Sequence, residues 1–157
     1  MKKYTPNYGY VEYLSTNPCG EIGMPNNMCR LILINLYSYV KNPFTDKARF
    51  NFDLFNDHVM KMLRLGDDII NIEIDYMKNI IKKVKSDPEP QYIKDIELST
   101  WKKYIENAEK YRRTGAGITR LGDYLAALGI KYGSDESIEV IDKIFKAKFK
   151  AFINYFN

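Results

Sequence analysis

The segment Asn17-Pro18-Cys19-Gly20-Glu21 places a side-chain amide, a thiol and a carboxylate within one short stretch of chain. In an extended loop, side chains two positions apart point the same way, so Asn17, Cys19 and Glu21 can converge on one ligand. Pro18 restricts the backbone, and Gly20 lets a ligand approach it closely. This pattern is suited to redox or nucleophilic chemistry, although plain turns have similar compositions.

The elements that position this segment are predicted to be strands and a loop within residues 1–45. Residues 8–14 are β-prone and predict a strand, whereas residues 15–27 contain two prolines and two glycines and predict a loop. Residues 30–40 are apolar, β-branched and aromatic, which predicts a second strand or extended segment that ends at Pro43.

Helical periodicity begins at about Asn51, where apolar residues start to recur at steps of three and four. The pattern predicts one long amphipathic helix, with a break or bend near Gly66 or Asp75. Pro88 and Pro90 are expected to end it, because proline removes a backbone donor and clashes with the preceding turn.

Three further helices are predicted downstream. The second covers residues 92–111 and is followed by a glycine-bearing turn at residues 112–117. The third covers residues 118–128 and stops at Gly129, a residue suited to the left-handed position after a helix. The last opens at Ser134, a residue type that caps helix N-termini.

The composition describes one ordinary globular domain. The chain has 157 residues, of which 45% are hydrophobic and 28% charged, with a net charge of +4. It shows neither a bilayer-length apolar run nor a secretion signal, and two cysteines do not make a disulfide scaffold. The predicted fold class is mainly α with a few strands, an α+β fragment. Two predicted strands cannot close a core, so they are expected to belong to a larger β layer.

Other residue groups favour structural roles. Lysines gather at residues 82–85 and 143–150, but acidic residues accompany both groups, so we expect solvated helix surfaces and no direct nucleic-acid binding. His58 has no matched partner for a metal or cobalamin, and Asp67 and Asp68 are expected to be solvated. Residues 115–117 resemble half a phosphate cradle, but a turn at a helix entry is favoured. No metal site is predicted.

The cysteine segment resembles the active-site segment of ribonucleotide reductase large chains, and most closely that of the adenosylcobalamin-dependent class. The resemblance rests on Ser15-Thr16-Asn17-Pro18-Cys19-Gly20-Glu21-Ile22, followed by Cys29-Arg30-Leu31 and Ile34-Asn35-Leu36. Further motifs continue it in the same order over nearly the whole chain from Tyr8: Asn42-Pro43-Phe44-Thr45, Gly66-Asp67-Asp68, Trp101, residues 112–119, Leu121-Gly122-Asp123 and residues 125–134.

The resemblance implies catalytic roles in this segment. Cys19 matches the cysteine that becomes a thiyl radical and removes the 3′ hydrogen of the ribose. Glu21 matches the carboxylate that takes the proton of the 3′-hydroxyl group. Asn17 matches the amide that hydrogen-bonds the sugar hydroxyls, and we expect Ser15 and Thr16 to contact the substrate beside it.

The resemblance also implies a redox role for Cys29, as one of two cysteines that supply electrons and end as a disulfide. The chain contains no third cysteine to act as its partner. A Cys19–Cys29 disulfide is not expected at rest, because a radical cysteine must be a free thiol. The family's phosphate-binding loop, its C-terminal cysteine pair and its effector loops are not found in these 157 residues.

The chain is therefore expected to be a single partial catalytic domain, residues 1–157, within a ten-stranded α/β barrel. Residues 1–45 would supply strands and the radical-cysteine loop, and residues 46–157 a helical segment. The expected cofactors are adenosylcobalamin and an external dithiol. The expected partners are a ribonucleoside di- or triphosphate, complementary reductase chains, and a thioredoxin- or glutaredoxin-type reductant in the cytoplasm. Alone, the chain is expected to be inactive.

Two alternatives stay open. The chain could come from a class that uses a separate metal-radical subunit, or it could be a non-catalytic remnant or interaction module. Without further strands, we expect an open apolar β face that promotes self-association. The residues assigned to that face are Tyr10, Leu14, Ile32, Ile34, Tyr37 and Tyr39.

Overall fold

The structure is a computed structural model that describes Asn26 and residues 28–156. The predicted strand at residues 8–14 and most of the predicted loop at residues 15–27 lie outside the described residues. The chain divides into two compact units. One contains residues 73–112, and the other contains residues 29–72 and 113–156.

The first helix, α1, is Phe52–Ser86 and ends just before Pro88, as predicted. It is one uninterrupted helix of 35 residues, so the predicted break near Gly66 or Asp75 is wrong. Its buried side chains recur with helical spacing on both sides of Gly66, so one apolar stripe runs through the expected break: Phe55, Val59, Met62, Leu63, Ile70, Ile74, Met77 and Val84.

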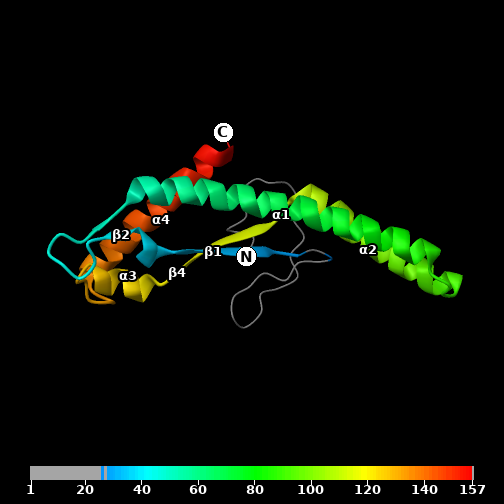
Figure 1. The fold of residues 1–157 in the computed structure, drawn as a ribbon, viewed down its shortest axis with the longest axis horizontal. Helices are drawn as coiled ribbons and strands as arrows, with labels where there is room; N and C mark the ends of the chain where they lie inside the picture. Colours follow the sequence, from blue (N-terminus) through cyan, green and yellow to red (C-terminus); the bar gives the residue numbers. More distant parts are fainter. Residues whose placement is uncertain (1–25, 27, 157) are drawn as a thin grey trace. The chain divides into compact units, whose positions relative to one another are not determined.

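The second helix, α2, is Gln91–Tyr111 and confirms the prediction for residues 92–111. Within the first unit it lies beside the second half of α1, joined to it by a short turn (Figure 1). Ile74 and Met77 of α1 and Ala108 of α2 are buried there. This unit is therefore a helical hairpin whose two helices bury apolar side chains.

The second unit combines short strands with helices. Its strands are β1 (Arg30–Asn35), β2 (Val40–Lys41), β3 (Arg49–Phe50) and β4 (Thr114–Thr119). Its helices are the 3-10 helix η2 (Leu36–Tyr39), the first part of α1, α3 (Leu121–Ala127) and α4 (Asp135–Phe156). β1 and β4 pair in parallel, from Arg30 opposite Thr114 to Asn35 opposite Thr119. β2 and β3 form an antiparallel pair.

Two sequence-based predictions fail in this unit. Residues 112–117 are not a turn, because β4 begins at Thr114, and the third helix starts at Leu121 instead of residue 118. Glycine and alanine carry little β propensity, and β1 supplies the hydrogen-bonding partner that makes this segment a strand. The extended segment predicted for residues 30–40 turns into a 3-10 helix after Asn35.

The core of the second unit is built around aromatic rings. Phe55, Tyr124, Leu36, Leu125 and Ile144 are fully buried. The Tyr39 and Phe55 rings meet edge to face with centroids 5.4 Å apart. Burial of a large apolar side chain stabilises a fold by about 1.5–3 kcal/mol, so each of these buried residues contributes to the stability of the unit.

Helix ends in the second unit match their predicted signals. Gly129 has φ of 73°, and its N–H donates to the Ala126 carbonyl over 3.0 Å. The Ile130 N–H donates to the Leu125 carbonyl over 2.9 Å, which completes a Schellman motif after α3. At the start of α4, the Ser137 N–H donates to Ser134 Oγ over 3.2 Å, so Ser134 caps the helix.

The structure confirms that the chain is mainly helical with a few strands. Two of those strands, β3 and β4, lie within residues 46–157, the part predicted to be helical. Over Asn26 and residues 28–156, no helix combines the length and apolar character that a bilayer span requires.

Candidate functional site

Most of the predicted site lies outside the described residues. This holds for Cys19, Glu21 and Asn17, and for Ser15 and Thr16 beside them. Their roles stay predictions. Cys29 is the one predicted site residue that the structure describes, and it is an exposed free thiol directly before β1.

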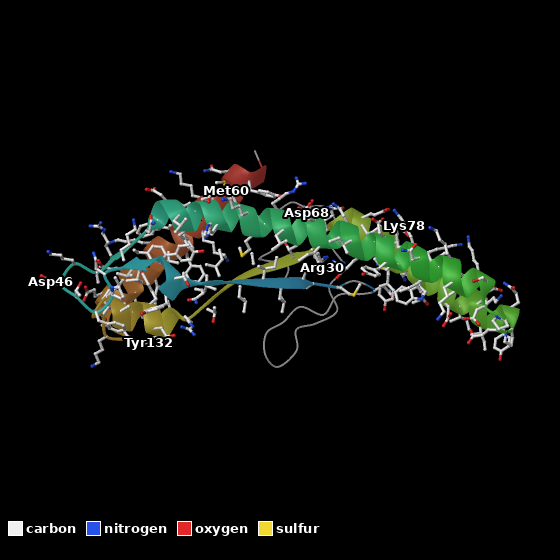
Figure 2. All side chains as sticks on the ribbon, in the orientation of Figure 1. Arg30, Asp46, Met60, Asp68, Lys78 and Tyr132 are labelled. Carbon is white, nitrogen blue, oxygen red and sulfur yellow. The ribbon has the colours of Figure 1, made fainter. Side chains whose placement is uncertain are left out.

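The alternation of side chains along β1 shows which face the thiol shares. Arg30, labelled in Figure 2, is 6% exposed and Ile34 is 7% exposed, whereas Leu31 and Leu33 are 70% and 61% exposed. Side chains of a strand alternate between its two faces, so residue 29 falls on the face of Leu31 and Leu33. We call the face formed by Cys29, Leu31 and Leu33 the open face of the β1–β4 pair.

Two glycines of β4 lie opposite these leucines. Gly115 pairs with Leu31 and Gly117 pairs with Leu33. A Cβ atom at Gly115 would lie 2.5 Å from Leu31 Cδ2 and 3.2 Å from Cys29 Sγ, and one at Gly117 would collide with Leu33. The glycines therefore let the leucine side chains lie across β4, and Gly115 leaves space beside the thiol.

The relation between Gly115 and the thiol is not evident from the sequence, because the glycines of residues 112–117 predict a turn. A usable signal was present, since the two glycines share the two-residue spacing of Leu31 and Leu33. Neither the turn nor the phosphate cradle considered for residues 115–117 describes this segment, which is a strand.

Helices of the second unit pack on the opposite face of the β1–β4 pair. A Cβ atom at Gly66 of α1 would lie 2.8 Å from Thr114 Cγ2, so α1 approaches β4 closely. Lys148 of α4 donates from Nζ to the Ala116 carbonyl over 2.5 Å, and burial lowers the pKa of this lysine. Ile32, Ala116 and Ile118 pack against the apolar core.

The open apolar face predicted from the sequence exists, but different residues form it. Ile34 and Tyr39 are buried, and Ile32 packs against the core, so these residues belong to the helix-covered face. The exposed apolar side chains of β1 are Leu31 and Leu33. Tyr10 and Leu14 lie outside the described residues.

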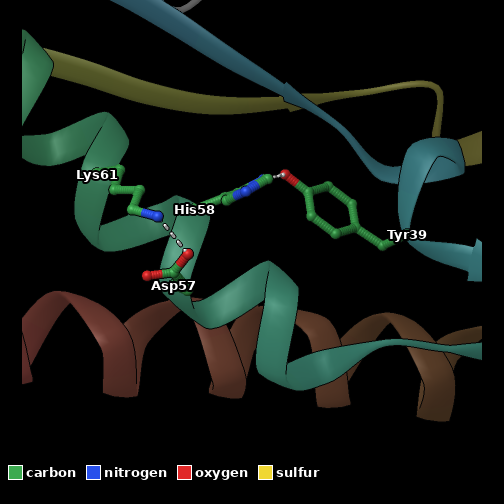
Figure 3. A network of polar contacts seen from close by, with 4 residues as sticks. All are labelled: Tyr39, Asp57, His58 and Lys61. Carbon is green, nitrogen blue, oxygen red and sulfur yellow. Dashed lines mark hydrogen bonds and ion pairs between the residues drawn. The ribbon is translucent and has the colours of Figure 1, made fainter.

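His58 is part of a polar contact at the edge of the core (Figure 3). Its Nδ1 atom lies 3.0 Å from the Tyr39 hydroxyl, with which it shares a hydrogen bond, and the two rings meet edge to face. Lys61 Nζ and Asp57 Oδ2 form a separate ion pair of 2.7 Å. Burial raises the pKa of Tyr39. This geometry fits the structural role expected for His58.

A pocket of about 300 Å³ lies at the other end of the strand pair. The residues that line it are Tyr37, Phe44, Arg120, Asp123 and Ala126. They follow the carboxyl ends of β1 and β4 in the chain, whereas Cys29 precedes β1. The pocket is therefore separate from the thiol. In the described part of the chain, no three His, Cys, Asp or Glu side chains gather as metal ligands would, and Asp68 pairs with Arg64.

Parallel strands with helices packed on one face are characteristic of α/β proteins, and the Cys29 thiol lies on the other face of this pair. This class of structure agrees with a comparison of the sequence with protein families. The family model described as "Ribonucleotide reductase, barrel domain" matches residues 5–152. The chain belongs to this family.

Curated relatives point to one class within the family. A vitamin B12-dependent ribonucleoside-diphosphate reductase of Thermoplasma acidophilum is 30% identical over 144 residues, which cover 91% of this chain and 15% of the relative. The reductase of the same name from Mycobacterium tuberculosis is 26% identical over 142 residues, or 90% of this chain and 16% of the relative. The chain thus spans about one sixth of these relatives. No solved structure matches it at a comparable level of significance.

Proposed function

We propose that this chain forms part of the catalytic subunit of a vitamin B12-dependent ribonucleotide reductase, as a single partial catalytic domain. The observation that carries the proposal is the Cys29 thiol, which is exposed at the start of β1 on the face opposite the helices. In an α/β barrel, helices cover the outside and the other face of each strand points inward. The open face would then line the interior of a ten-stranded barrel.

The remaining strands of that barrel would come from polypeptide beyond these 157 residues, in the same or in complementary chains. The described part of the chain contains one parallel pair and one short antiparallel pair of strands. The relatives are several times longer, which provides the length for further strands. We therefore expect the 157-residue chain alone to be inactive.

Cys19 and Glu21 would carry out the first chemical step. The Cys19 sulfur radical takes a hydrogen atom from C3′ of the ribose, which leaves a thiol on the enzyme and a radical on the sugar. Glu21 accepts the proton of the 3′-hydroxyl group as a general base. Asn17, with Ser15 and Thr16, would hold the sugar hydroxyls in place.

Cys29 would provide electrons for the reduction itself. The 2′-hydroxyl group leaves as water, and the two electrons come from Cys29 and a second thiol, which become a disulfide. An external dithiol, from a small reductant or a thioredoxin- or glutaredoxin-type protein, would then restore both thiols. The exposure of Cys29 supports this role, because a partner thiol must reach it.

The names of the relatives favour adenosylcobalamin as the radical source and a ribonucleoside diphosphate as the substrate. The cofactor would supply a radical through cleavage of its carbon–cobalt bond. His58, the one histidine of the sequence, lies beside the core, where its Nδ1 atom shares a hydrogen bond with the Tyr39 hydroxyl.

A chimeric enzyme tests the proposed function. Residues 5–152 would replace the matching segment of the Thermoplasma acidophilum reductase, and product would be measured with adenosylcobalamin and a dithiol. We expect turnover by this chimera, its loss in Cys19→Ala, and a decrease of about 10²- to 10⁴-fold in Glu21→Gln. Ser99→Ala, on an exposed part of α2, is the control. Full activity in Cys19→Ala would refute the assignment.

A further inference from the structure

Lys148 is the lysine of helix α4 that points into the protein instead of into solvent. Its Nζ atom donates to the Ala116 carbonyl of β4 over 2.5 Å, and burial lowers its pKa. The neighbouring Lys146 and Lys150 are exposed, and Lys146 pairs with Asp142 on the same helix over 2.6 Å. Burying an ammonium group costs free energy unless it is hydrogen-bonded, so the contact with β4 offsets the burial of Lys148.

The strand that receives this hydrogen bond has little side-chain volume to fix its position. Its middle residues are Gly115, Ala116 and Gly117, so only one methyl group is available for packing there. Glycine within a strand weakens it, because there is no side chain to pack and the backbone loses more entropy on folding. A hydrogen bond from α4 to the Ala116 carbonyl therefore fixes the part of β4 that packing holds least.

The same part of β4 sets the surroundings of the Cys29 thiol. Gly115, next to Ala116, pairs with Leu31 of β1. A Cβ atom at Gly115 would lie 2.5 Å from Leu31 Cδ2 and 3.2 Å from Cys29 Sγ, so the backbone of β4 already lies close to both side chains. A displacement of β4 toward or away from β1 therefore changes the space beside the sulfur.

We propose that Lys148 is a positioning residue for the redox reaction of Cys29. Its hydrogen bond to the Ala116 carbonyl holds β4 at the spacing that keeps Gly115 and Leu31 beside the thiol. Lys148 comes from the helix-covered face of the strand pair and Cys29 lies on the open face, so the lysine acts through the strand and does not touch the sulfur. This inference rests on the proposed function, because it assigns a redox reaction to Cys29.

Thiol reactivity of the 157-residue chain tests the placement without any turnover. In a Cys19→Ser background, Lys148→Met should speed alkylation of Cys29 by iodoacetamide several-fold, because an untethered β4 no longer holds Gly115 against the thiol. Lys146→Met is the matched control, since it makes the same substitution at an exposed lysine of the same helix. Urea denaturation should give Lys148→Met at least the wild-type stability, because an apolar side chain of similar length replaces a buried charge.

A purely structural lysine would give a different result. The unfolding free energy of Lys148→Met would fall, and the folded variant would be alkylated at the wild-type rate. That result, or equal alkylation rates in Lys148→Met and Lys146→Met, would overturn the proposal.

Kinetics of the chimera that carries residues 5–152 test the consequence for the reaction. Lys148→Met should lower kcat by about 10- to 100-fold, since a small misplacement of a reacting group can cost that much, and should leave KM nearly unchanged. Lys148→Arg, which keeps a charged donor, should regain most of the lost kcat. Wild-type kcat in Lys148→Met, or a change confined to KM, would overturn the inference. An inactive wild-type chimera would instead refute the proposed function, and the alkylation rates would still decide whether Lys148 positions the thiol.

Discussion

The space beside Cys29 is set by a residue on another strand. Gly115 pairs with Leu31, and a Cβ atom there would lie 3.2 Å from Cys29 Sγ, closer than ordinary van der Waals contact. A methyl group at this position would crowd one side of the thiol and displace Leu31. Access to Cys29 is therefore a property of β4 as well as of β1.

This geometry makes a prediction about thiol reactivity. In a Cys19→Ser background, where Cys29 is the only thiol, Gly115→Ala should slow alkylation of Cys29 by iodoacetamide several-fold. Gly117→Ala is the matched control, because its added methyl group would meet Leu33 and not the sulfur. Equal alkylation rates in the two variants would show that Gly115 does not govern access to the thiol.

Ionisation of Tyr124 is expected to lower the stability of the fold at alkaline pH. Burial raises the pKa of this tyrosine from 10.0 to about 12. The folded state therefore holds the phenol proton more tightly than the unfolded state. The contribution of this proton to the free energy of unfolding is complete below pH 10 and is lost as the pH rises toward about 12.

Tyr124→Phe should therefore flatten the fall in unfolding free energy between pH 10 and about 12, as measured by urea denaturation. Tyr132→Phe is the control, because it makes the same substitution at an exposed tyrosine. If the wild-type protein and Tyr124→Phe lose stability in parallel over this range, Tyr124 is not the group responsible.

At the scale of the elements, helix ends offer a direct test of the fold. Ser134→Ala removes the side-chain oxygen that accepts from the Ser137 N–H, and such a loss typically costs about 1 kcal/mol. Ser99→Ala on α2 should change stability little, because its hydroxyl group only donates back to the Ile96 carbonyl. Equal unfolding free energies for the two variants would contradict the capping role of Ser134.

The helices were predictable because their signals are local. Apolar spacing identified α1 and α2, and Gly129 and Ser134 marked helix ends at the correct residues. The break predicted near Gly66 failed because tertiary contact overrides the low helix propensity of glycine. Gly66 lies against Thr114 of β4, where a larger side chain would not fit without a shift.

The strands were harder to predict because their partners are distant in sequence. β4 pairs with a strand more than 80 residues earlier, and its glycines and alanine carry no local β signal. The face of β1 that is open could not be derived from its composition either. Residues 31–34 are all apolar, so both faces of β1 carry apolar side chains. The packing of α1 and α4 therefore decides that Ile34 is covered and Leu33 is not.

At the scale of the whole molecule, the parallel strand pair of the described residues agrees with the barrel domain of the family. The described residues provide a strip of α/β sheet that exposes a thiol on the face away from its helices. The motif around Cys19 lies outside the described residues, so its assignment depends on the sequence alone. Cys29 is the point at which the structure and the predicted chemistry can be tested together.

The most direct test is the redox state of Cys29 after turnover. The chimera that carries residues 5–152 would be reduced, freed of dithiol, and supplied with adenosylcobalamin and a ribonucleoside diphosphate. Mass spectrometry of the digested protein would then follow Cys29 while the product is quantified. We predict that deoxyribonucleotide forms together with a disulfide that contains Cys29, and that Cys29→Ser forms no product, because one of the two thiols that supply the electrons is missing. Product formation with Cys29 still a free thiol, or undiminished dithiol-supported turnover in Cys29→Ser, would contradict it.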